Sequence, residues 1–173
     1  LVPQAILEKI SGTQTPEPYI AEVPFPIFQP LNGKTRLLAL DGISDPGNLG
    51  TLLRTALALG FEGVFITSDC TDPFSDKALR AAKGATFRLP LQMGTVENLL
   101  TLIQENGLTP YIADAKGDVH PSFESPLILI LGNEAHGPSP KLKNSGKLLS
   151  IPISDQTESL NVAVAGGILM HKI

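Results

Sequence analysis

The feature that most constrains the fold is an unbroken aliphatic run from Leu127 to Leu131, with Pro126 before it and Gly132 after it. A strand covered on one face alternates apolar and polar residues, whereas a strand covered on both faces is apolar throughout. Parallel sheets are covered by helices on both faces. The run therefore predicts a buried strand of a parallel sheet in an α/β domain.

Short apolar runs alternate with stretches of helical periodicity from Arg36 onward, which is the pattern of successive βαβ units. The predicted strands cover residues 36–40, 64–67, 87–91, 110–114, 127–131 and 148–153. The predicted helices cover residues 47–59, 76–83 and 95–106, followed by a short helix from about residue 138 and a final helix after residue 159. We expect an α/β fold with a parallel sheet of about six strands flanked by helices.

The predicted helix at 47–59 has clear signals at both ends. Asp45 can cap its amino end, Pro46 suits its first turn, and Gly60 can end it. Arg54 lies on the side of this helix opposite its apolar stripe. The stripe consists of Leu49, Leu52, Leu53, Ala56 and Leu57.

Composition narrows the class of protein. The length of 173 residues suits one domain with part of a second, and 42% hydrophobic residues argue against disorder. No apolar run approaches the roughly 18 residues that a membrane span requires, so we expect no membrane association. Cys70 is the only cysteine and the three histidines are scattered, which argues against a disulfide framework or a metal site. We therefore expect no metal and a location in the reducing cytoplasm.

The first 30 residues contain six of the 15 prolines, which disfavour regular helices and central strands. They indicate a linker along the surface of the domain, with the domain boundary near Gly33. The chain begins at Leu1 and has no signal-peptide pattern, so we expect a processed chain or an excised fragment.

The common nucleotide-binding and hydrolase signatures are missing. Residues 132–139 have the spacing of a phosphate loop, but Pro138 stands where that loop needs its lysine. No G-x-G-x-x-G motif follows a predicted strand, and no G-x-S-x-G motif occurs at a strand-helix turn. The sequence therefore argues against an ordinary kinase, ATPase, dehydrogenase or serine hydrolase.

Three other stretches combine a predicted strand or helix end with a polar turn. They read Asp45-Pro-Gly-Asn48-Leu-Gly followed by Arg54, then Leu131-Gly132-Asn133-Glu134 with Gly137, then Ile151-Pro152 with Ser159-Leu160-Asn161. In this order and spacing they resemble the three motifs of the SpoU (TrmH-like) RNA ribose 2'-O-methyltransferases, which belong to the SPOUT class. The resemblance covers about Gly33 to Ile173. The segment Ile10 to Val23 also resembles the end of the family's amino-terminal RNA-binding domain.

The resemblance implies two parts: residues 1–32, a linker and remnant of an RNA-binding domain, and residues 33–173, a methyltransferase domain. It also implies a trefoil knot near the carboxyl end, bound S-adenosylmethionine, a homodimer with the site near the subunit interface, and an RNA substrate. Within the family, ribosomal RNA is a more frequent substrate than transfer RNA. The close threading of a knot fits a run of small residues, Ala163, Ala165, Gly166 and Gly167.

The resemblance also assigns site residues. The positions that match the cofactor loops are Gly132, Asn133, Ile151 and Leu160. The positions that match invariant polar residues, and that are expected to be catalytic, are Asn48, Arg54, Glu134, Ser159 and Asn161. The reaction must align a ribose 2'-hydroxyl with the sulfonium methyl group and help that hydroxyl to lose its proton. Descriptions of the family assign the removal of this proton to the arginine. Because a guanidinium pKa exceeds about 12, we expect Arg54 to bind phosphate and stabilise the developing alkoxide instead.

Each of these polar residues also has a purely structural interpretation. Asn48 can satisfy the backbone of its turn, and Arg54 can be a solvated helix charge. Glu134 can cap the helix near residue 138, and Ser159 can cap the final helix. Two residues outside the set are expected to be structural: His136, which departs from the usual family residue, at the surface, and Asp114 in a loop.

The net charge of −4 argues against nucleic acid binding unless the chain has a local basic face. Lys77, Arg80 and Lys83 supply such a face on the predicted helix at 76–83, with Arg88 just beyond it. This face can meet an RNA backbone or can be an ordinary solvated surface. An RNA 2'-O-methyltransferase is the leading hypothesis, and a non-catalytic RNA-binding module that keeps the fold is the alternative.

Overall fold

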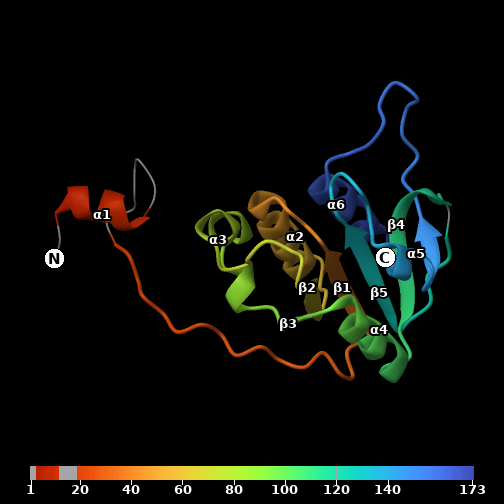
Figure 1. Ribbon diagram of the computed structural model, residues 1–173, viewed down its shortest axis with the longest axis horizontal. Helices are drawn as coiled ribbons and strands as arrows, with labels where there is room; N and C mark the ends of the chain where they lie inside the picture. Colours follow the sequence, from red (N-terminus) through yellow and green to blue (C-terminus); the bar gives the residue numbers. More distant parts are fainter. Residues whose placement is uncertain (1–2, 12–18, 120) are drawn as a thin grey trace.

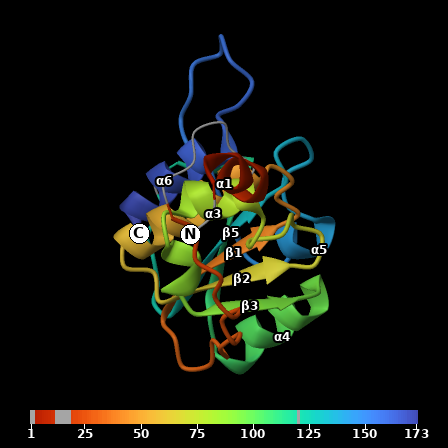
Figure 2. The same cartoon turned by 90° about the vertical axis from the view of Figure 1, so that its left-hand side faces the viewer.

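The computed structural model describes residues 3–11, 19–119 and 121–173, and within them six strands form one sheet (Figure 1). The strands are β1 (Arg36–Asp41), β2 (Gly63–Thr67), β3 (Leu91–Gly94), β4 (Thr109–Asp118), β5 (Leu127–Gly132) and β6 (Lys147–Leu149). Their order is β3-β2-β1-β5-β4-β6, and every neighbouring pair is parallel. Figure 2 shows β5, β1, β2 and β3 following one another in this order. The predicted parallel α/β sheet is confirmed.

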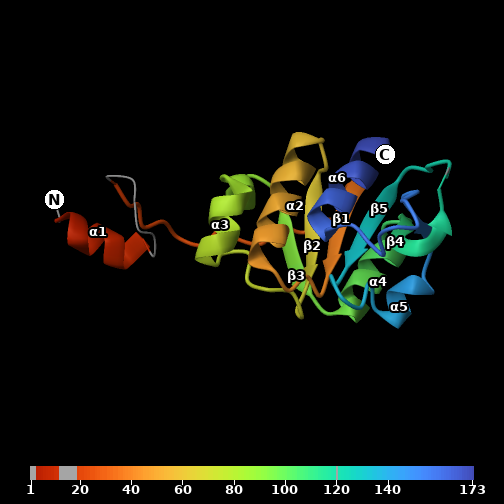
Figure 3. The ribbon, with the colours of Figure 1, turned by 90° about the horizontal axis from the view of Figure 1, so that it is seen from above.

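Helices cover both faces of the sheet (Figure 3). The helices are α1 (Gln4–Ser11), α2 (Pro46–Ala58), α3 (Asp76–Ala82), α4 (Val96–Glu105), α5 (Pro140–Lys143) and α6 (Val162–Lys172), with a 3-10 turn, η1 (Ala85–Phe87). Helices α2, α3 and α6 lie together on one face, and α4 and α5 lie on the other. The sheet is thus the middle of three layers, as its apolar strands require.

Strand β1 shows how the sequence fills both layers. Leu38 and Leu40 are fully buried in the core that contains the leucines of α2, while Leu37 and Ala39 are fully buried in the core that contains Leu99 of α4. Strand β5 is divided between the two cores in the same alternating way. The aliphatic run therefore forms a strand covered on both sides, as predicted.

The small residues of α6 bring this helix close to its neighbours. A Cβ atom at Gly166 would collide with the side chains of Leu52 on α2 and Leu131 on β5. Gly167 has more room, because its nearest neighbour would be a methyl carbon of Thr55 at 3.8 Å. Helix α2 and strand β5 thus approach α6 closely at Gly166.

The strand predicted at 87–91 is wrong. The backbone nitrogens of Arg88 and Leu89 both donate to the carbonyl of Ala85, so these residues continue the helical turn of η1. Pro90 has no N–H for a strand ladder, and β3 begins only at Leu91. Other predicted bounds shift as well: β6 ends at Leu149 rather than at residue 153, β4 ends at Asp118 rather than at residue 114, and α5 begins at residue 140.

The amino-terminal segment packs on the sheet only near its end. Leu31 is fully buried, and the backbone nitrogen of Gln29 donates to the carbonyl of Leu91 on the edge strand β3. Helix α1 has no buried residue and lies apart from the sheet in Figure 1. Of the segment from Ile10 to Val23 that resembles the end of an RNA-binding domain, residues 12–18 lie outside the described part of the chain. No helix in the described part is long and apolar enough to cross a membrane.

The sheet order also fixes where a site can form. Strands β1 and β5 are neighbours, and the chain continues from them into the loops that begin at Gly42 and Asn133. From β1 the sheet grows outward through β2 to β3, and from β5 it grows the other way through β4 to β6. In α/β proteins, ligands bind at the carboxyl ends of strands at such a point of reversal.

Candidate active site

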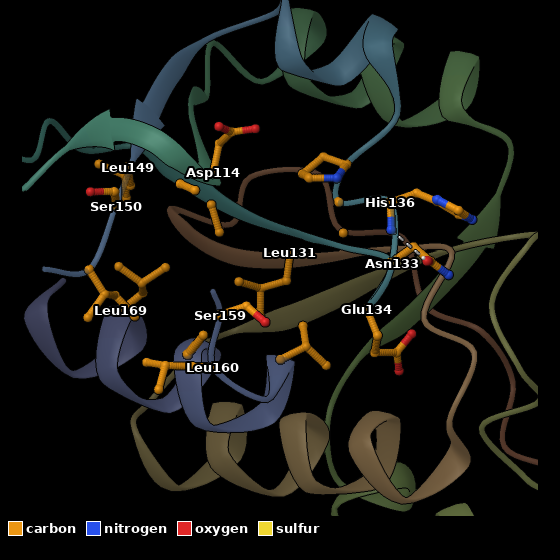
Figure 4. Close-up of a pocket in the computed structure, with 18 of the residues that line it drawn as sticks. Asp114, Leu131, Asn133, Glu134, His136, Leu149, Ser150, Ser159, Leu160 and Leu169 are labelled. Atoms are coloured by element: carbon orange, nitrogen blue, oxygen red, sulfur yellow. Dashed lines mark hydrogen bonds between the residues drawn. The ribbon is translucent and has the colours of Figure 1, made fainter. Parts of the chain in front are cut away.

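A cavity of about 430 Å³ lies at the carboxyl ends of β4 and β5 (Figure 4). Its lining consists of residues 113–116 of β4, residues 131–138 at the end of β5, Lys143 of α5, and parts of the segments 149–153 and 158–169. Figure 4 shows Leu160 and Leu169 on one side of this cavity, and Asp114 and His136 on the other. We call it the cofactor cavity, because Gly132, Ile151 and Leu160, which the resemblance assigns to cofactor binding, line it.

Bare backbone forms part of the cavity wall at Gly132. A Cβ atom there would collide with the backbone of Gly137 and Pro138, because the loop after β5 folds straight back. A bridge between Asn133 and Gly137, with the nitrogen of Gly137 donating to the carbonyl of Asn133 at 2.9 Å, closes this loop. Gly137 has φ +68°, a conformation that a residue with a side chain rarely adopts.

The side chain of Asn133 holds the loop together. Its amide nitrogen donates to the carbonyl of Gly42 at 2.7 Å, which ties the loop after β5 to the loop after β1. Its oxygen accepts from the backbone nitrogens of Ala135 at 2.9 Å and His136 at 3.1 Å. Asn133 therefore lines the cavity, but the polar atoms of its side chain form hydrogen bonds within the surrounding loops. His136 is exposed, as expected, and also lines the cavity.

Glu134 is the acceptor for a cluster of donors from the loop before α2. Its carboxylate accepts from the backbone nitrogens of Ser44 and Asp45, each at 3.1 Å, and from the Ser44 hydroxyl at 2.7 Å. It also accepts from the side-chain nitrogen of Asn48 at 3.0 Å. Partial burial acts to raise the pKa of Glu134, but these hydrogen bonds, first that of Asn48, outweigh it and hold the pKa at about 2. These bonds go to the loop before α2, so the structural alternative, in which Glu134 caps the helix near residue 138, does not apply.

Asn161 and Asn48 connect the third motif to the first. The side-chain nitrogen of Asn161 donates to the side-chain oxygen of Asn48 at 3.0 Å. The oxygen of Asn161 accepts from the backbone nitrogens of Ala163 and Val164, at 2.9 and 3.3 Å, and so caps α6. Asn161 is the cap of the final helix, and the expectation that Ser159 caps it is wrong.

The remaining members of the third motif line the cofactor cavity. Ile151 and Leu160 are half-buried there, and Ser159 is exposed. In Figure 4 the Ser159 hydroxyl lies beside Leu131, near the middle of the cavity. Six of the nine predicted site residues thus line the cavity, and Asn48 and Asn161 are joined to it by hydrogen bonds through Glu134.

Arg54 is the exception. It is exposed on α2, as its position opposite the leucine stripe predicts. The described residues that line the cofactor cavity do not include it. A second hollow, of about 640 Å³, lies between α2, α3 and α6, and Asn48 and Asn161 line it. The described residues that line this hollow do not include Arg54 either. We call this second hollow the polar groove.

Asp114 and Lys143 form an ion pair in the cavity wall. The sequence did not indicate either residue as part of the site. Lys143 Nζ lies 2.8 Å from an oxygen of Asp114, whose side chain is only 13% exposed. The hydrogen bond from Lys143 lowers the pKa of Asp114 below its usual value. Asp114 lies inside β4, so its expected loop position is wrong. Ser44 was missed as well, and no local pattern marks it as the partner of Glu134.

Among the described residues, no group of three or more metal-ligating side chains gathers.

Comparison with known proteins identifies the family. A family model described as "SpoU rRNA Methylase family" matches residues 35–171. The "Uncharacterized tRNA/rRNA methyltransferase slr1673" of Synechocystis sp. is 36% identical over 181 residues, which cover 99% of this chain and 65% of that protein. The "23S rRNA (guanosine(2553)-2'-O)-methyltransferase RlmP" of Bacillus subtilis is 34% identical, over 95% of this chain and 67% of that protein.

A solved structure agrees with these relatives. The AdoMet-bound rRNA methyltransferase from Sinorhizobium meliloti superposes with a TM-score of 0.84 at 29% identity, over 98% of this chain and 69% of that one. The chain spans between 45% and 67% of the length of the curated relatives compared with it. The hydrogen bonds that join the three motifs and the family match over residues 35–171 agree, and the chain belongs to the SpoU rRNA methylase family.

Proposed function

We propose that this chain transfers the methyl group of S-adenosylmethionine to a ribose 2'-hydroxyl of RNA. The bond from sulfur to the methyl carbon breaks as the bond from the 2'-oxygen forms, the hydroxyl proton passes to water, and S-adenosylhomocysteine remains. The observation that carries the proposal is the hydrogen-bonded series of Asn161, Asn48 and Glu134, which joins all three motifs. Glu134 lines the cofactor cavity, whereas Asn48 and Asn161 line the polar groove. A methyl donor in the cavity and a ribose in the groove would therefore meet at this series.

The cofactor cavity fits S-adenosylmethionine in size and in charge. Its volume of about 430 Å³ lies in the range of roughly 300 to 1,000 Å³ that is typical of small-molecule sites. Leu131, Ile151 and Leu160 supply apolar walls for an adenine ring. A ligand with a sulfonium, an ammonium and a carboxylate group needs charges of both signs around it. The cavity has both signs, in Asp114, Lys116, Glu134, Lys143 and Glu158.

Four residues hold the cofactor in this proposal. Gly132 presents backbone that no side chain covers, and Ile151 and Leu160 enclose the adenine. Asn133 acts indirectly, because its bond to the carbonyl of Gly42 fixes the loop that forms the wall.

The polar residues orient the ribose. Asn48 and Asn161 present their amides to the groove, and Ser159 presents its hydroxyl to the cavity, so these three can align the 2'-hydroxyl for in-line attack. Glu134 has a pKa of about 2 and four donors around it, which makes it a poor proton acceptor near neutral pH. We assign Glu134 the role of a positioning residue that fixes Asn48.

Arg54 requires a second subunit in this proposal. It lines neither the cavity nor the groove of its own chain, so we infer that it acts at the site of the other subunit of a homodimer. The exposed apolar side chains of Val164 and Ile168, one helical turn apart on α6, support a dimer through this helix. Val164 also lines the polar groove, so the other subunit would border that groove. At that site Arg54 binds the neighbouring phosphate and stabilises the developing alkoxide, since a guanidinium group does not act as a base.

The family supports three finer proposals. Ribosomal RNA is the substrate that the relatives favour, because the Bacillus relative carries the name of a 23S rRNA methyltransferase. An RNA substrate and a single cysteine suit the cytoplasm. We also propose the division into a linker at 1–32 and a methyltransferase domain at 33–173, which agrees with a family match that begins at residue 35.

We further infer a trefoil knot near the carboxyl end. The segment after β6 leaves the sheet at its edge, and α6 returns to pack on α2 and β5 in the middle. The loop at 132–138 and the segment at 149–160 line the same cavity, as a chain threaded past that loop would. The close contacts at Gly166 agree with such threading.

The test has a binding arm and a reaction arm. Isothermal titration should show heat with S-adenosylmethionine and with S-adenosylhomocysteine, and both should raise the melting temperature. Mapping of 2'-O-methyl groups in total RNA should show at least one modification lost in a strain without the gene and restored by adding it back. The absence of heat and of a thermal shift at millimolar cofactor would overturn the proposal, and RNA binding without methyl transfer would favour the non-catalytic module.

A further inference from the structure

The polar groove has charged residues at one end that the proposed methyl transfer does not use. Asn48 and Asn161 lie in its lining, and so do Lys77 and Arg80 of α3. Asp45 is the one carboxylate among the described residues that line it. The groove therefore runs from the residues that would orient a ribose to two cations on a neighbouring helix.

Small residues fix α3 beside the first turns of α2. A Cβ atom at Gly50 would collide with the backbone of Ala78 and would lie 2.8 Å from the Cβ of Ala81. A Cβ atom at Gly47 would lie 3.1 Å from the Cε of Lys77, so the lysine stem lies across the amino end of α2. The position of the two cations relative to Asn48 is thus set by close packing and not by mobile side chains alone.

Both cations are held by carboxylates that water reaches. Lys77 Nζ lies 2.5 Å from Asp45 Oδ2, with 59% and 42% of the two side chains exposed. Arg80 lies 2.6 Å from Asp76, with 49% and 66% exposed. Ion pairs exposed to this extent contribute little to stability, so a phosphate group can replace the carboxylate at modest cost.

Asp45 can release Lys77 without losing its own structural role. Its Oδ1 atom accepts from the backbone nitrogen of Asn48 at 2.9 Å and caps α2, while its Oδ2 atom contacts Lys77. The cap remains when the lysine turns to another anion. The hydrogen bond from Lys77 lowers the pKa of Asp45, so this carboxylate is charged near neutral pH and competes with a phosphate for the lysine.

We propose that the polar groove binds one of the two RNA phosphodiesters that flank the target nucleotide, with Lys77 and Arg80 as its phosphate-binding residues and Asp45 as the carboxylate that RNA displaces, while Arg54 binds the other. This inference rests on the proposed function, because it takes Asn48 and Asn161 as the place of the target ribose. It also narrows the basic face predicted from the sequence. Lys83 ends α3 in a left-handed conformation with φ 50°, and neither it nor Arg88 is in the described lining of the groove.

The test compares charge-neutral variants on two faces of the full chain. Lys77→Gln and Arg80→Gln remove the groove cations, and Lys141→Gln is the matched control, because Lys141 forms a similarly exposed ion pair with Glu97. The probe is a fluorescein-labelled single-stranded RNA, titrated at several salt concentrations. On single strands each phosphate contact contributes about 0.7 to the salt slope, which corresponds to about a fourfold loss of affinity at 0.15 M salt.

A variant that binds RNA more tightly distinguishes this proposal from damage to the fold, because a damaged fold would weaken binding. Asp45→Asn keeps an oxygen that caps α2 but removes the charge that competes for Lys77, so it should bind the RNA more tightly than the wild type. S-adenosylmethionine affinity, measured by titration, should stay within twofold for all four variants. If the wild type binds cofactor and methylates RNA, the proposed function stands whatever these variants do.

The outcomes decide between a specific subsite and a general charge effect. Weaker binding and a smaller salt slope for the two groove variants alone would support the subsite. Equal losses for Lys141→Gln would show that net charge is responsible, and unchanged binding for Lys77→Gln and Arg80→Gln would show that the phosphate lies elsewhere. Either result overturns the inference, as would weaker RNA binding by Asp45→Asn.

Discussion

The backbone of Pro138 fills the space into which a side chain at Gly132 would point. The end of β5 and the loop after it are therefore in direct backbone contact, and the wall of the cofactor cavity is made of main chain. A wall of this kind cannot adjust by changing a rotamer, because the atoms in contact are not side-chain atoms. This explains why the motif has glycine at its first position after the aliphatic run.

Gly132→Ala should lower the free energy of unfolding by about 1 to 3 kcal/mol, the usual cost of overpacking, and should abolish cofactor binding. The added methyl group must push the 132–138 loop into the cavity. Gly167→Ala is the control, because its Cβ would meet only ordinary contact distances and alanine favours a helix. Urea unfolding and calorimetric titration measure the two effects. Normal cofactor affinity in Gly132→Ala would contradict the role of this wall.

Glu134→Gln tests the carboxylate that gathers the loop before α2. The native pKa of about 2 lies below the ordinary value of 4.5, so the carboxylate stabilises the fold fully above pH 4.5 and loses this effect as the pH falls towards 2. We expect the variant to be less stable than the wild type by about 1 kcal/mol at pH 7, a value kept small because Glu134 is largely exposed. The difference should shrink between pH 4.5 and 2.

Chemical unfolding at a series of pH values measures that difference. Glu158→Gln is the matched control, because Glu158 lines the same cavity from an exposed loop. A stability difference for Glu134→Gln that stays constant from pH 7 to pH 2 would show that the loss is one of packing and not of charge.

Local patterns predicted most of the fold. The run from Leu127 to Leu131 indicated a strand covered on both faces, and Asp45 and Pro46 marked the start of α2. The strand at 87–91 failed because its apolar residues belong to a helical turn, and only the hydrogen bonds to Ala85 reveal this. The family resemblance, which the comparisons confirm, was the basis for predicting the polar residues of the site.

The same patterns could not predict how the site is assembled. Asn48 and Asn161 are 113 positions apart, and no periodicity links residues at such a distance. The ion pair of Asp114 with Lys143 could not be predicted either, because it depends on how β4 and α5 lie relative to each other. The leucine stripe predicted that Arg54 is exposed, but periodicity within one helix does not show that it lies outside both the cavity and the groove.

Asn161→Asp separates the two roles of Asn161. An aspartate still caps α6 and interacts favourably with the amino end of the helix, so the melting temperature should stay close to that of the wild type. It cannot donate to the Asn48 oxygen, so methyl transfer should fall by about tenfold or more, in line with the loss of one positioning contact. Single-turnover rates on a validated RNA measure the loss. Wild-type rates would mean that the contact between the two asparagines is structural only.

Arg54→Ala should leave folding and cofactor affinity nearly unchanged while removing most methyl transfer. The side chain is exposed and lies opposite the leucine stripe of α2, so its loss should change the free energy of unfolding by no more than about 0.5 kcal/mol. If a second subunit supplies this residue, mixing Arg54→Ala with a variant that is inactive through Asn161 should restore part of the activity in mixed dimers. Failure of that restoration, with both variants dimeric, would place Arg54 at the site of its own chain.

Val164→Asp and Ile168→Asp test the dimer through α6. Both side chains are exposed, at 53% and 37%, on the face of α6 that points away from the sheet core. A buried interface cannot hold an unpaired carboxylate without a large cost, so each variant should be monomeric at concentrations where the wild type is a dimer. Met93→Asp is the matched control, because Met93 is 38% exposed on the edge strand β3. Light scattering after gel filtration gives the masses, and a Val164→Asp protein that remains dimeric would exclude this face as the interface.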